Sequence, residues 1–354
     1  MAQSKIRVGI VGYGGMGSWH ADQIRESDVV QLAGIYDIRR ERCEQAQEKG
    51  IGVYRSFRAM LEDETLDLVV VATPNDIHED LVIKALRAGK HVICEKPVTL
   101  TLESLNRMIA AAEEEGRCFS THQNRRWDSD YLAMKQIKES GEIGRVINME
   151  SRYHGSRGIP GDWRGEKSYG GGMLYDWGIH LIDQVLGIFG YDNVDSVFCQ
   201  EDHITNAEVD DGFKLLINFK TGERAHIEVG TYNFINMPRF YMRAENGTAI
   251  INDRKNKNEP AQVVRCTSWH EDNVKPIQAG AGLTKTMAPR NEITTETYTV
   301  ARPDSDVHDY YRNFVRAIRG EEELIVKHNE MRADLAVILA AFESARTGAT
   351  VKIG

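Results

Sequence analysis

The 354-residue sequence has few prolines, no paired cysteine motif and no long apolar run. Its five cysteines are odd in number and widely separated, without a Cys-x-x-Cys pair, which disfavours a disulfide framework or a cysteine zinc site. Only 8 prolines accompany 31 glycines, and 41% of the residues are hydrophobic, so a disordered or collagen-like chain is excluded. No apolar stretch reaches the roughly 18 residues that a transmembrane helix needs. We therefore expect a globular protein in a reducing, cytoplasmic setting.

The sequence also lacks an excess of positive charge. Its 44 basic and 53 acidic residues give a net charge of −9, which disfavours a phosphate backbone or an anionic membrane as the main partner. The N-terminal residues 1–5 lead directly into an apolar run and lack the pattern of a secretory signal peptide. We expect neither nucleic acid nor a membrane as partner, and the length predicts about two domains.

Short β-branched runs alternate with amphipathic segments over the first third of the chain. The pattern predicts strands over residues 6–11, 31–36, 66–72 and 91–94, and helices over residues 16–26, 77–88 and 102–115. The uninterrupted apolar residues 68–71 are typical of a strand buried on both faces. Residues 1–122 are therefore predicted to form a doubly wound α/β domain around a parallel sheet.

After residue 122 the pattern changes to strands that alternate polar and apolar residues. Such strands are predicted over residues 145–153, 212–220, 225–232 and 242–245, and helices over residues 129–139, 308–319 and 329–347. Turn signals at Thr221-Gly222 and Asn246-Gly247 favour a largely antiparallel sheet. Residues 123–354 are predicted to form this second α/β domain.

Residues 252–300 show little periodicity and are rich in lysine, asparagine, glycine and proline. A stretch of that length without regular structure is more often a functional lid or an oligomer arm than a linker. Disorder is the alternative.

A glycine-rich turn follows the first predicted strand and opens the first predicted helix. Its sequence is Gly12-Tyr13-Gly14-Gly15-Met16-Gly17, and the next strand ends at Asp37, twenty residues after Gly17. These glycines allow a tight turn, close approach to a pyrophosphate and packing of the helix on the strand, and the helix N-terminus attracts phosphate. Asp37 at this distance is suited to a ribose 2′-hydroxyl, which predicts NAD. Arg39 and Arg40 leave NADP open.

Two further motifs lie at the carboxyl ends of predicted parallel strands, the edge where ligands of such sheets bind. Thr73-Pro74-Asn75, with His78, follows one strand, and Glu95-Lys96-Pro97 follows the next. Asn75 and His78 are equally well explained as helix-capping and surface residues. A partly desolvated lysine at this edge can donate to a substrate oxygen.

Three glycines, residues 170–172, precede a pattern of acids and histidine. Asp176, His180 and Asp183 are spaced i, i+4 and i+7, so a helix over this segment presents them on one face. An aspartate one turn from a histidine can orient the imidazole, which suits proton transfer from an alcohol. The same residues could hold a metal, but no further histidine or cysteine cluster supports one, and no metal is expected.

Together these motifs resemble those of the Gfo/Idh/MocA oxidoreductases, which include glucose-fructose oxidoreductase and the inositol dehydrogenases. The resemblance covers essentially the whole chain, and the residues that carry it are the turn at residues 12–17, Thr73-Pro74-Asn75 with His78, Glu95-Lys96-Pro97, and the triple glycine followed by Asp176 and His180. It implies a Rossmann domain followed by an α/β domain whose open sheet forms a subunit interface, and hence a homo-oligomer, a dimer or tetramer. It also implies that Lys96, Asp176 and His180 are catalytic and that the Lys96–Pro97 bond is cis.

The resemblance assigns further residues to the ligands. Residues 122–128 resemble a segment of sugar- and inositol-oxidising members. Polyol recognition needs fixed donors and an apolar wall, for which Asn124, Arg125, Tyr153 and Trp163 are candidates beside the catalytic residues. Trp163-Arg164 resembles a pair that lies near the nicotinamide in relatives. The cofactor candidates beyond the glycine turn and Asp37 are Thr73, Pro74, Asn75, His78, Glu95, Lys96, Gln123, Trp163 and Arg164. Residues 252–300 resemble insertions in members acting on larger glycosides, which disfavours a simple inositol.

We therefore expect an NAD(P)-dependent dehydrogenase that oxidises a ring secondary hydroxyl of a sugar, glycoside or inositol. His180 is the first choice as proton acceptor, with Asp176 holding its ring and Lys96 binding the substrate oxygen. The spacing leaves open that Lys96 and His180 exchange these roles. Two alternatives are a redox-assisted, NAD-dependent glycosidase and a non-catalytic sugar or nucleotide sensor.

Overall fold

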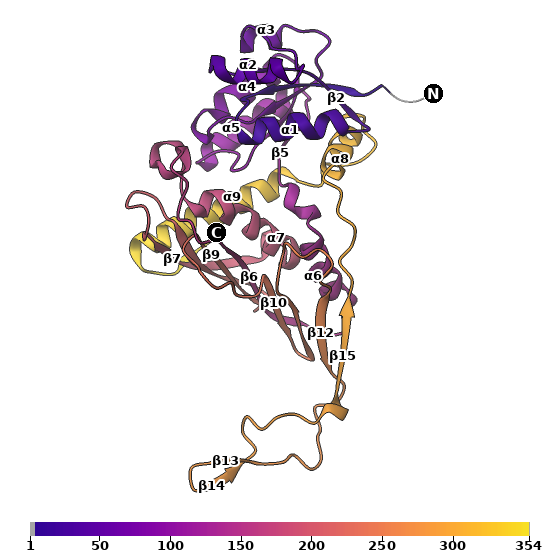
Figure 1. The fold of residues 1–354 in the computed structure, drawn as a ribbon, viewed down its shortest axis with the longest axis vertical. Coiled ribbons are helices and arrows are strands. Elements are labelled where there is room, and N and C mark those ends of the chain that lie inside the picture. Colours follow the sequence, from indigo (N-terminus) through magenta and orange to yellow (C-terminus); the bar gives the residue numbers. More distant parts are fainter. Residues whose placement is uncertain (1–3, 354) are drawn as a thin grey trace.

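Two sheets dominate the computed structural model, which describes residues 4–353 (Figure 1). Within these residues, a five-stranded sheet has the order β2-β1-β3-β4-β5, and a nine-stranded sheet has the order β15-β12-β11-β10-β6-β9-β8-β7-β16. Residues 1–3, part of the segment considered for a signal peptide, lie outside the described chain. The arrangement confirms the predicted fold class, a Rossmann-type parallel sheet followed by a largely antiparallel sheet.

The first sheet is parallel throughout. Its strands are β1 (Ile6–Val11), β2 (Val30–Tyr36), β3 (Leu68–Val71), β4 (His91–Cys94) and β5 (Phe119–Thr121), and its helices are α1 (Gly15–Glu26), α2 (Arg40–Glu48), α3 (Phe57–Leu61), α4 (His78–Arg87) and α5 (Leu102–Glu114). All residues of β3 are fully buried, as the uninterrupted apolar run predicts. The strand order reverses between β1 and β3, the point at which open α/β sheets bind ligands.

The second sheet pairs its strands antiparallel except where β6 meets β9. Its strands are β6 (Val146–His154), β7 (Val194–Asp202), β8 (Gly212–Phe219), β9 (Arg224–Gly230), β10 (Phe240–Ala244), β11 (Gly247–Ile251), β12 (Ala261–Cys266), β15 (Thr295–Val300) and β16 (Val351–Lys352). Helices α6 (Ser129–Ser140), α7 (Ile179–Phe189) and α9 (His328–Thr347) lie along it in Figure 1. Its apolar side chains alternate along the strands and pack under these helices, because successive side chains of a strand point to opposite faces.

After the second sheet, the chain returns to the first domain. Helix α8 (Asp309–Ile318) lies beside the N-terminal domain in Figure 1. Tyr310, Tyr311 and Phe314 belong to the same buried cluster as β1, β3 and β4. The predicted boundary at residue 122 separates the two sheets, but it does not separate two cores. We propose that α8 is counted with the N-terminal domain.

Residues 252–300 contain more regular structure than their sequence predicts. Strands β12 and β15 extend the second sheet, and residues 267–294 between them form an arm that projects away from both sheets (Figure 1). The short hairpin of β13 (Ile277–Ala279) and β14 (Gly282–Thr284) lies in this arm. The expectation of little regular structure was wrong for β12 and β15. Strand β15 forms the edge of the sheet and β12 lies next to it, and both leave many side chains exposed, so the strands carry only a weak apolar signal.

Several connections between these elements contain short helical turns. They are η1 (Asn75–Ile77), η2 (Asn124–Trp127), η3 (Trp163–Gly165), η4 (Lys167–Tyr169), the π-type turn η5 (Leu174–Gly178), η6 (Tyr191–Asn193) and η7 (Glu292–Thr294). All five cysteines are free. Among residues 4–353, no helix combines the length and the apolar character needed to cross a bilayer.

A buried ion pair joins η2 to helices α7 and α9. The Arg126 guanidinium lies 2.5 Å from the carboxylate of Asp183 and 2.6 Å from that of Glu330. The side chain of Asp183 is 1% exposed, so its charge depends on Arg126.

Replacing Arg126 with methionine is expected to destabilise the protein strongly. Loss of one partner leaves the buried carboxylate of Asp183 uncompensated, which typically costs about 3–5 kcal/mol. Urea unfolding measures the change in the free energy of unfolding. Arg40→Met is the control, because the exposed pair of Arg40 with Glu44 on α2 is worth about 0–1 kcal/mol. Equal losses in the two variants would contradict the importance of the buried pair.

Candidate active site

The glycine-rich turn between β1 and α1 has the form of a phosphate cradle. Gly12 has a φ of +90°, and a Cβ added there would lie 2.5 Å from the carbonyl oxygen of Ala72. A Cβ on Gly17 would lie 1.9 Å from the carbonyl oxygen of Gly12. In contrast, a Cβ on Gly14 or Gly15 would meet nothing within 4 Å, so the outer side of the turn is open. Gly14 provides no side-chain cap to α1, which leaves the first N–H groups of the helix available to an anion.

Asp37 is held beside this turn by two backbone N–H groups. Its Oδ2 accepts from the backbone of Tyr13 at 2.6 Å, and its Oδ1 accepts from the backbone of Arg39 at 2.8 Å. A carboxylate has about four lone-pair sites, so these bonds fix its orientation and still leave acceptor capacity for a ribose hydroxyl. Asp37 therefore fits its predicted place at the adenosine end of a dinucleotide.

Thr73 lies across the turn, at the carboxyl end of β3. Its Oγ1 atom is buried and has no hydrogen-bond partner in the structure, and its methyl group lies 3.0 Å from a Cβ built on Gly12. Pro74 follows it, and Met16 is half-buried in the first turn of α1. An orphaned hydroxyl beside the glycine turn fits a bound dinucleotide.

Three other predicted cofactor residues are bonded to the protein instead. His78 contacts the carbonyl oxygen of Thr73 through Nε2 at 2.8 Å and that of Pro97 through Nδ1 at 3.2 Å. The Asn75 amide donates to the Gly170 carbonyl oxygen at 3.1 Å. Both side chains are buried, so the surface role does not describe them, and their contact with a cofactor stays a prediction. They join loops that are distant in sequence, which the local motif cannot show.

Glu95, the third of these residues, is the centre of a buried histidine pair. Its Oε1 lies 2.8 Å from Nε2 of His20 and 2.8 Å from Nδ1 of His122. Burial acts to raise the pKa of Glu95, but the two histidines outweigh it and the pKa is well below its usual value. Within residues 4–353 these three side chains are the group whose spacing suits a metal, yet hydrogen bonds already join their ligand atoms. Glu95 therefore acts as a charged anchor, and its Oε2 accepts the backbone N–H of Lys96 at 3.2 Å.

Lys96 joins the two domains through Asp176. Its Nζ donates to the Asp176 carboxylate at 2.7 Å and to the Asp176 carbonyl oxygen at 2.8 Å. Arg164 approaches the same carboxylate at 3.3 Å. Burial acts to raise the pKa of Asp176, but Lys96 and Arg164 lower it below the usual value. The Lys96–Pro97 bond is cis, as the resemblance implied.

His180 lies in the first turn of α7, buried next to this ion pair. Its pKa is lowered well below the usual value by burial, and further by the charges of Lys96 and Arg125. Its Nδ1 contacts Oε1 of Gln123 at 3.2 Å. The Gln123 amide, which was predicted to bind the cofactor, therefore makes a hydrogen bond within the protein. His180 is therefore a neutral imidazole near the Lys96 ammonium.

The expected contact between Asp176 and His180 was wrong. Asp176 lies in the π-type turn η5, whereas His180 lies in α7, so the spacing of a regular α-helix does not apply across them. The carboxylate of Asp176 forms ion pairs with Lys96 and Arg164, and that of Asp183 forms an ion pair with Arg126. These three residues do not form one stripe.

Asp210 and the triple glycine shape this turn. The carboxylate of Asp210 accepts from the backbone of Leu174 at 2.8 Å, at the start of η5. A Cβ on Gly172, whose φ is +105°, would lie 2.1 Å from that carboxylate. Burial, with help from Glu201, raises the pKa of Asp210 to about 8. Glycine is thus needed where the chain passes the acid that caps η5.

An aromatic wall stands next to Asp176. The rings of Tyr153 and Trp177 stack with centroids 3.5 Å apart, and the Arg125 guanidinium lies 4.5 Å from the Trp177 centroid. Tyr153, Trp177 and Asp176 line a cavity of about 160 Å³. Among the other substrate candidates, Asn124 is half-buried on η2, and Trp163 lies under the guanidinium of Arg164 at 4.6 Å.

Arg254 is a residue of this wall that the sequence analysis missed. Its Nη2 donates to the Tyr153 hydroxyl at 3.1 Å, and its guanidinium lies 3.7 Å from Asp128. Asp128 also pairs with Arg125, at 3.1 Å. Arg254 comes from the aperiodic segment after β11, where no local motif marks it.

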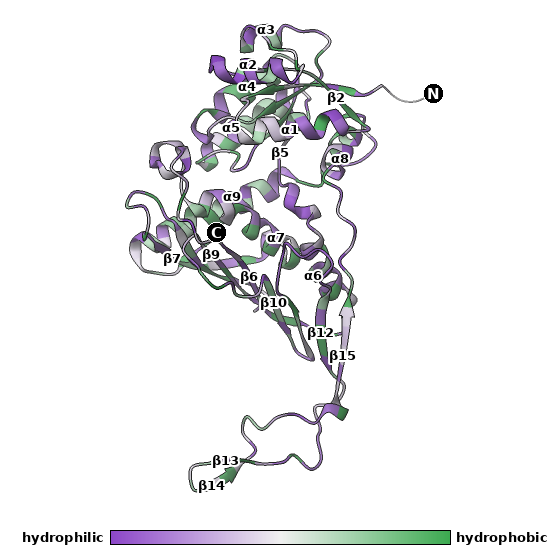
Figure 2. Cartoon of the chain, in the orientation of Figure 1, coloured by the Kyte–Doolittle hydropathy of each residue, from purple (hydrophilic) through white to green (hydrophobic). Residues whose placement is uncertain are grey.

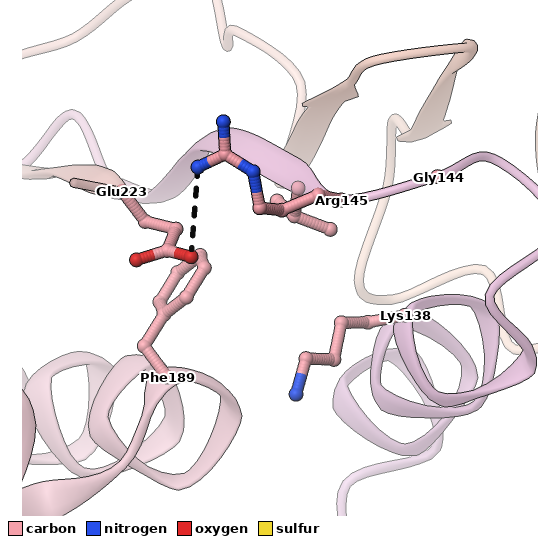
Figure 3. A pocket seen from close by; sticks show the side chains of 6 residues that line it. Lys138, Gly144, Arg145, Phe189 and Glu223 are labelled. Carbon is pink, nitrogen blue, oxygen red and sulfur yellow. Dashed lines mark ion pairs between the residues drawn. The ribbon is translucent and has the colours of Figure 1, made fainter. Parts of the chain in front are cut away.

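A second cavity, of about 140 Å³, lies elsewhere on the C-terminal domain (Figure 3). Lys138 and Arg145 border it, and Arg145 lies 4.0 Å from Glu223. None of the predicted site residues lines it. The candidate site is therefore the region of the Lys96–Asp176 ion pair and of His180, in the helix that follows Asp176.

Both domains match known sequence families. Residues 6–123 match the family described as "Oxidoreductase family, NAD-binding Rossmann fold". Residues 131–250 match the "GFO/IDH/MocA C-terminal domain".

Individual proteins are similar over different shares of the chain. A solved NAD-binding protein from Listeria innocua is 44% identical, with a TM-score of 0.92 over 99% of this chain and 100% of its own. The scyllo-inositol 2-dehydrogenase (NADP(+)) of Bacillus subtilis is 28% identical over 98% of this chain and 96% of its own. An oxidoreductase of Schizosaccharomyces pombe is 40% identical, but the match spans only 47% of this chain and 46% of that relative.

Replacing Asp37 with alanine is expected to weaken NAD binding and spare NADP. A hydrogen bond to a charged group contributes about 1.5–3 kcal/mol, so the dissociation constant of NADH should rise roughly 10- to 100-fold. NADPH should bind no worse, because the variant loses a charge that repels a 2′-phosphate. Titration of cofactor fluorescence measures both constants. Asp22→Ala on α1 is the control, and equal weakening of the two cofactors would show that Asp37 does not contact the ribose.

Proposed function

The chain belongs to the Gfo/Idh/MocA family of NAD(P)-dependent oxidoreductases, and on this premise we propose that it oxidises a ring secondary hydroxyl of a sugar, glycoside or inositol. The observation that carries the proposal is the meeting of Lys96, Asp176 and His180 at the junction of the two domains. The similarity to a scyllo-inositol dehydrogenase over nearly the whole chain supports a cyclic polyol. Bound nicotinamide would supply the hydride acceptor.

The glycine turn, Asp37 and Thr73 would hold the dinucleotide, and Lys96 would hold the substrate oxygen. The Lys96 ammonium has three N–H donors, two of which now point to Asp176. A substrate hydroxyl in this place would receive an N–H donor that is already oriented. Such a donor offsets the negative charge that develops on the oxygen as its proton leaves. Asp176 is the residue that holds this ammonium in position.

His180 would accept the hydroxyl proton. A depressed pKa keeps its imidazole neutral, as a base requires. Gln123 occupies Nδ1, and among residues 4–353 no hydrogen bond engages Nε2. We therefore assign the donor role to Lys96 and the acceptor role to His180.

The wall beside Asp176 suits a sugar ring. Tyr153 and Trp177 provide an apolar surface, and Arg125 and Arg254 provide donors at its edge. Ligand sites for small polar molecules combine such a surface with a few fixed polar groups. Asn124, which precedes Arg125 in η2, would add an amide.

A substrate screen tests the proposal. Inositols, aldoses and glycosides are offered with NAD and with NADP, and the absorbance of the reduced cofactor is followed. Lys96→Met should lower kcat by at least about 100-fold, because it removes a donor to the reacting oxygen. The variant should still bind cofactor in the fluorescence titration. Lys84→Met on α4, which removes an exposed lysine, should turn over normally.

The screen also separates the alternatives. Release of an aglycone without net cofactor reduction would contradict the dehydrogenase and support the redox-assisted glycosidase. Saturable sugar binding without turnover would favour the sensor. Near-normal rates in Lys96→Met would refute the assigned role of that residue. A cytoplasmic location stays a prediction.

We also propose that the arm at residues 267–294 contacts a second copy of the chain. Residues 273–289 contain only two charged side chains, Lys275 and Lys285. Leu283 is 68% exposed and Met287 is 90% exposed, and the end of the arm includes hydrophobic colouring in Figure 2. A two-stranded hairpin is marginal in water by itself, and grouped exposed apolar residues mark interfaces. In a homo-oligomer, the exposed apolar side chains of this arm would pack against the second copy.

Charging the arm is expected to weaken the oligomer. The double variant Leu283→Asp/Met287→Asp introduces a charge of −2 among side chains that should be buried against the partner copy. Light scattering at several protein concentrations measures the mass. Lys257→Asp is the control, because it makes the same charge change at an exposed turn outside the arm. A wild-type monomer, or an unchanged mass in the double variant, would refute the role of the arm.

A further inference from the structure

A chain of hydrogen bonds runs from His180 into the protein interior. Nδ1 of His180 lies 3.2 Å from Oε1 of Gln123, and Nε2 of Gln123 lies 3.3 Å from Oδ2 of Asp334. His180 comes from α7, Gln123 follows β5, and Asp334 comes from α9, so the chain links both domains. His180 is 5% exposed and the other two side chains are 1% exposed. No water is needed to explain these contacts.

The chemistry of these groups fixes the direction of every bond. An unprotonated carboxyl oxygen accepts, so Oδ2 of Asp334 binds the NH₂ group of Gln123 and turns the amide oxygen toward His180. An amide oxygen also only accepts, so Nδ1 of His180 must carry the proton. A neutral imidazole has one N–H, which leaves the lone pair on Nε2.

We propose that Gln123 and Asp334 are positioning residues that select the Nδ1–H tautomer of His180 and so make Nε2 the proton acceptor. This inference rests on the proposed function, in which His180 is the base. It assigns to Gln123 and Asp334 the orienting role that the sequence pattern suggested for Asp176. Asp176 cannot fill that role here, because Lys96 and Arg164 take its carboxylate.

The groups around His180 set its charge but do not choose its tautomer. Lys96, Arg125 and His122 disfavour the protonated ring, and Glu95 favours it. Burial adds to the first effect, so the ring stays neutral. Gln123 makes the hydrogen bond to Nδ1, so the choice between the two neutral forms depends on the Gln123 amide.

Asp334 is itself held by charged neighbours. Burial and the nearby Asp183 raise the pKa of Asp334, whereas Arg126 acts to lower it. Glu330 also faces this group and acts to raise its pKa. A hydrogen bond with Asp183 also raises this pKa, so a proton on the Asp334 carboxyl group lies toward Asp183 and Oδ2 keeps its lone pair for the Gln123 amide. Arg126 fixes Asp183 and Glu330 in turn, which keeps the arrangement rigid.

Nitrogen NMR of the full-length protein tests the tautomer directly. The protein is labelled with ¹⁵N-histidine, and the His180 signals are assigned from their absence in His180→Asn. The expected pattern is a protonated Nδ1 and an unprotonated Nε2. In Asp334→Asn the new amide can donate or accept, so Gln123 can turn around and Nε2–H should be populated. A protonated Nε2 in the wild type, or an unchanged pattern in both Asp334→Asn and Gln123→Met, would overturn the inference.

Kinetics with two replacements of Gln123 provide the functional test. Gln123→Glu keeps an acceptor at Nδ1 but adds a negative charge, which raises the pKa of His180. With the higher pKa, His180 becomes protonated at a higher pH and can then no longer accept a proton. The acidic limb of the kcat/KM profile should therefore move up by about one pH unit or more. Gln123→Met lacks the acceptor, and its kcat should fall roughly tenfold or more, with KM changed less.

A purely structural role would give a different result. Both variants would then lose activity alike, and the acidic limb would stay in place. Thermal melting shows whether each variant folds. If Gln123→Met does not fold, the pH limb of Gln123→Glu and the NMR pattern of Asp334→Asn decide the question. Because the NMR experiment needs no substrate, it can fail while the proposed reaction stands, and it can succeed while the substrate screen fails.

Discussion

The ion pair between Lys96 and Asp176 is the interaction on which the site depends. Lys96 follows strand β4 of the first sheet, and Asp176 lies in the turn that leads into α7 of the second domain. Each partner has its own support: Glu95 binds the backbone of Lys96, and Asp210 caps the turn that holds Asp176. The pair is largely buried, so its strength depends on good geometry from both sides. The two domains must therefore keep one relative position for the site to exist.

Much of the fold was predictable because it follows from local periodicity. The buried run of β3, the glycine turn and Asp37 are each set within one strand–helix unit, and the structure places them together. The strands β12 and β15 were missed because many of their side chains are exposed and polar, which leaves a weak apolar signal. The return of α8 to the first core was missed for another reason, since no local pattern tells a helix which sheet it will cover.

The site was predictable in its residue types more than in its contacts. Spacing along an α-helix suggested that Asp176 serves His180, but a π-type turn intervenes and Gln123 takes that place. His78 has the appearance of a surface or ligand residue in its motif, yet its Nδ1 contacts the carbonyl oxygen of Pro97 on the neighbouring loop. Arg254 and Asp334 reach the site from distant segments. Such partnerships depend on tertiary packing, which one sequence read locally does not contain.

The return of α8 to the N-terminal core also limits how this architecture can be recombined. The core of the first sheet includes Tyr310, Tyr311 and Phe314, although these residues follow its last strand by almost two hundred residues in the sequence. A nucleotide-binding half taken from one homologue and joined to the catalytic half of another would therefore meet foreign aromatic side chains in its own interior. Natural or engineered shuffling at the apparent junction should succeed only when helix α8 is transferred together with the N-terminal half whose core it completes.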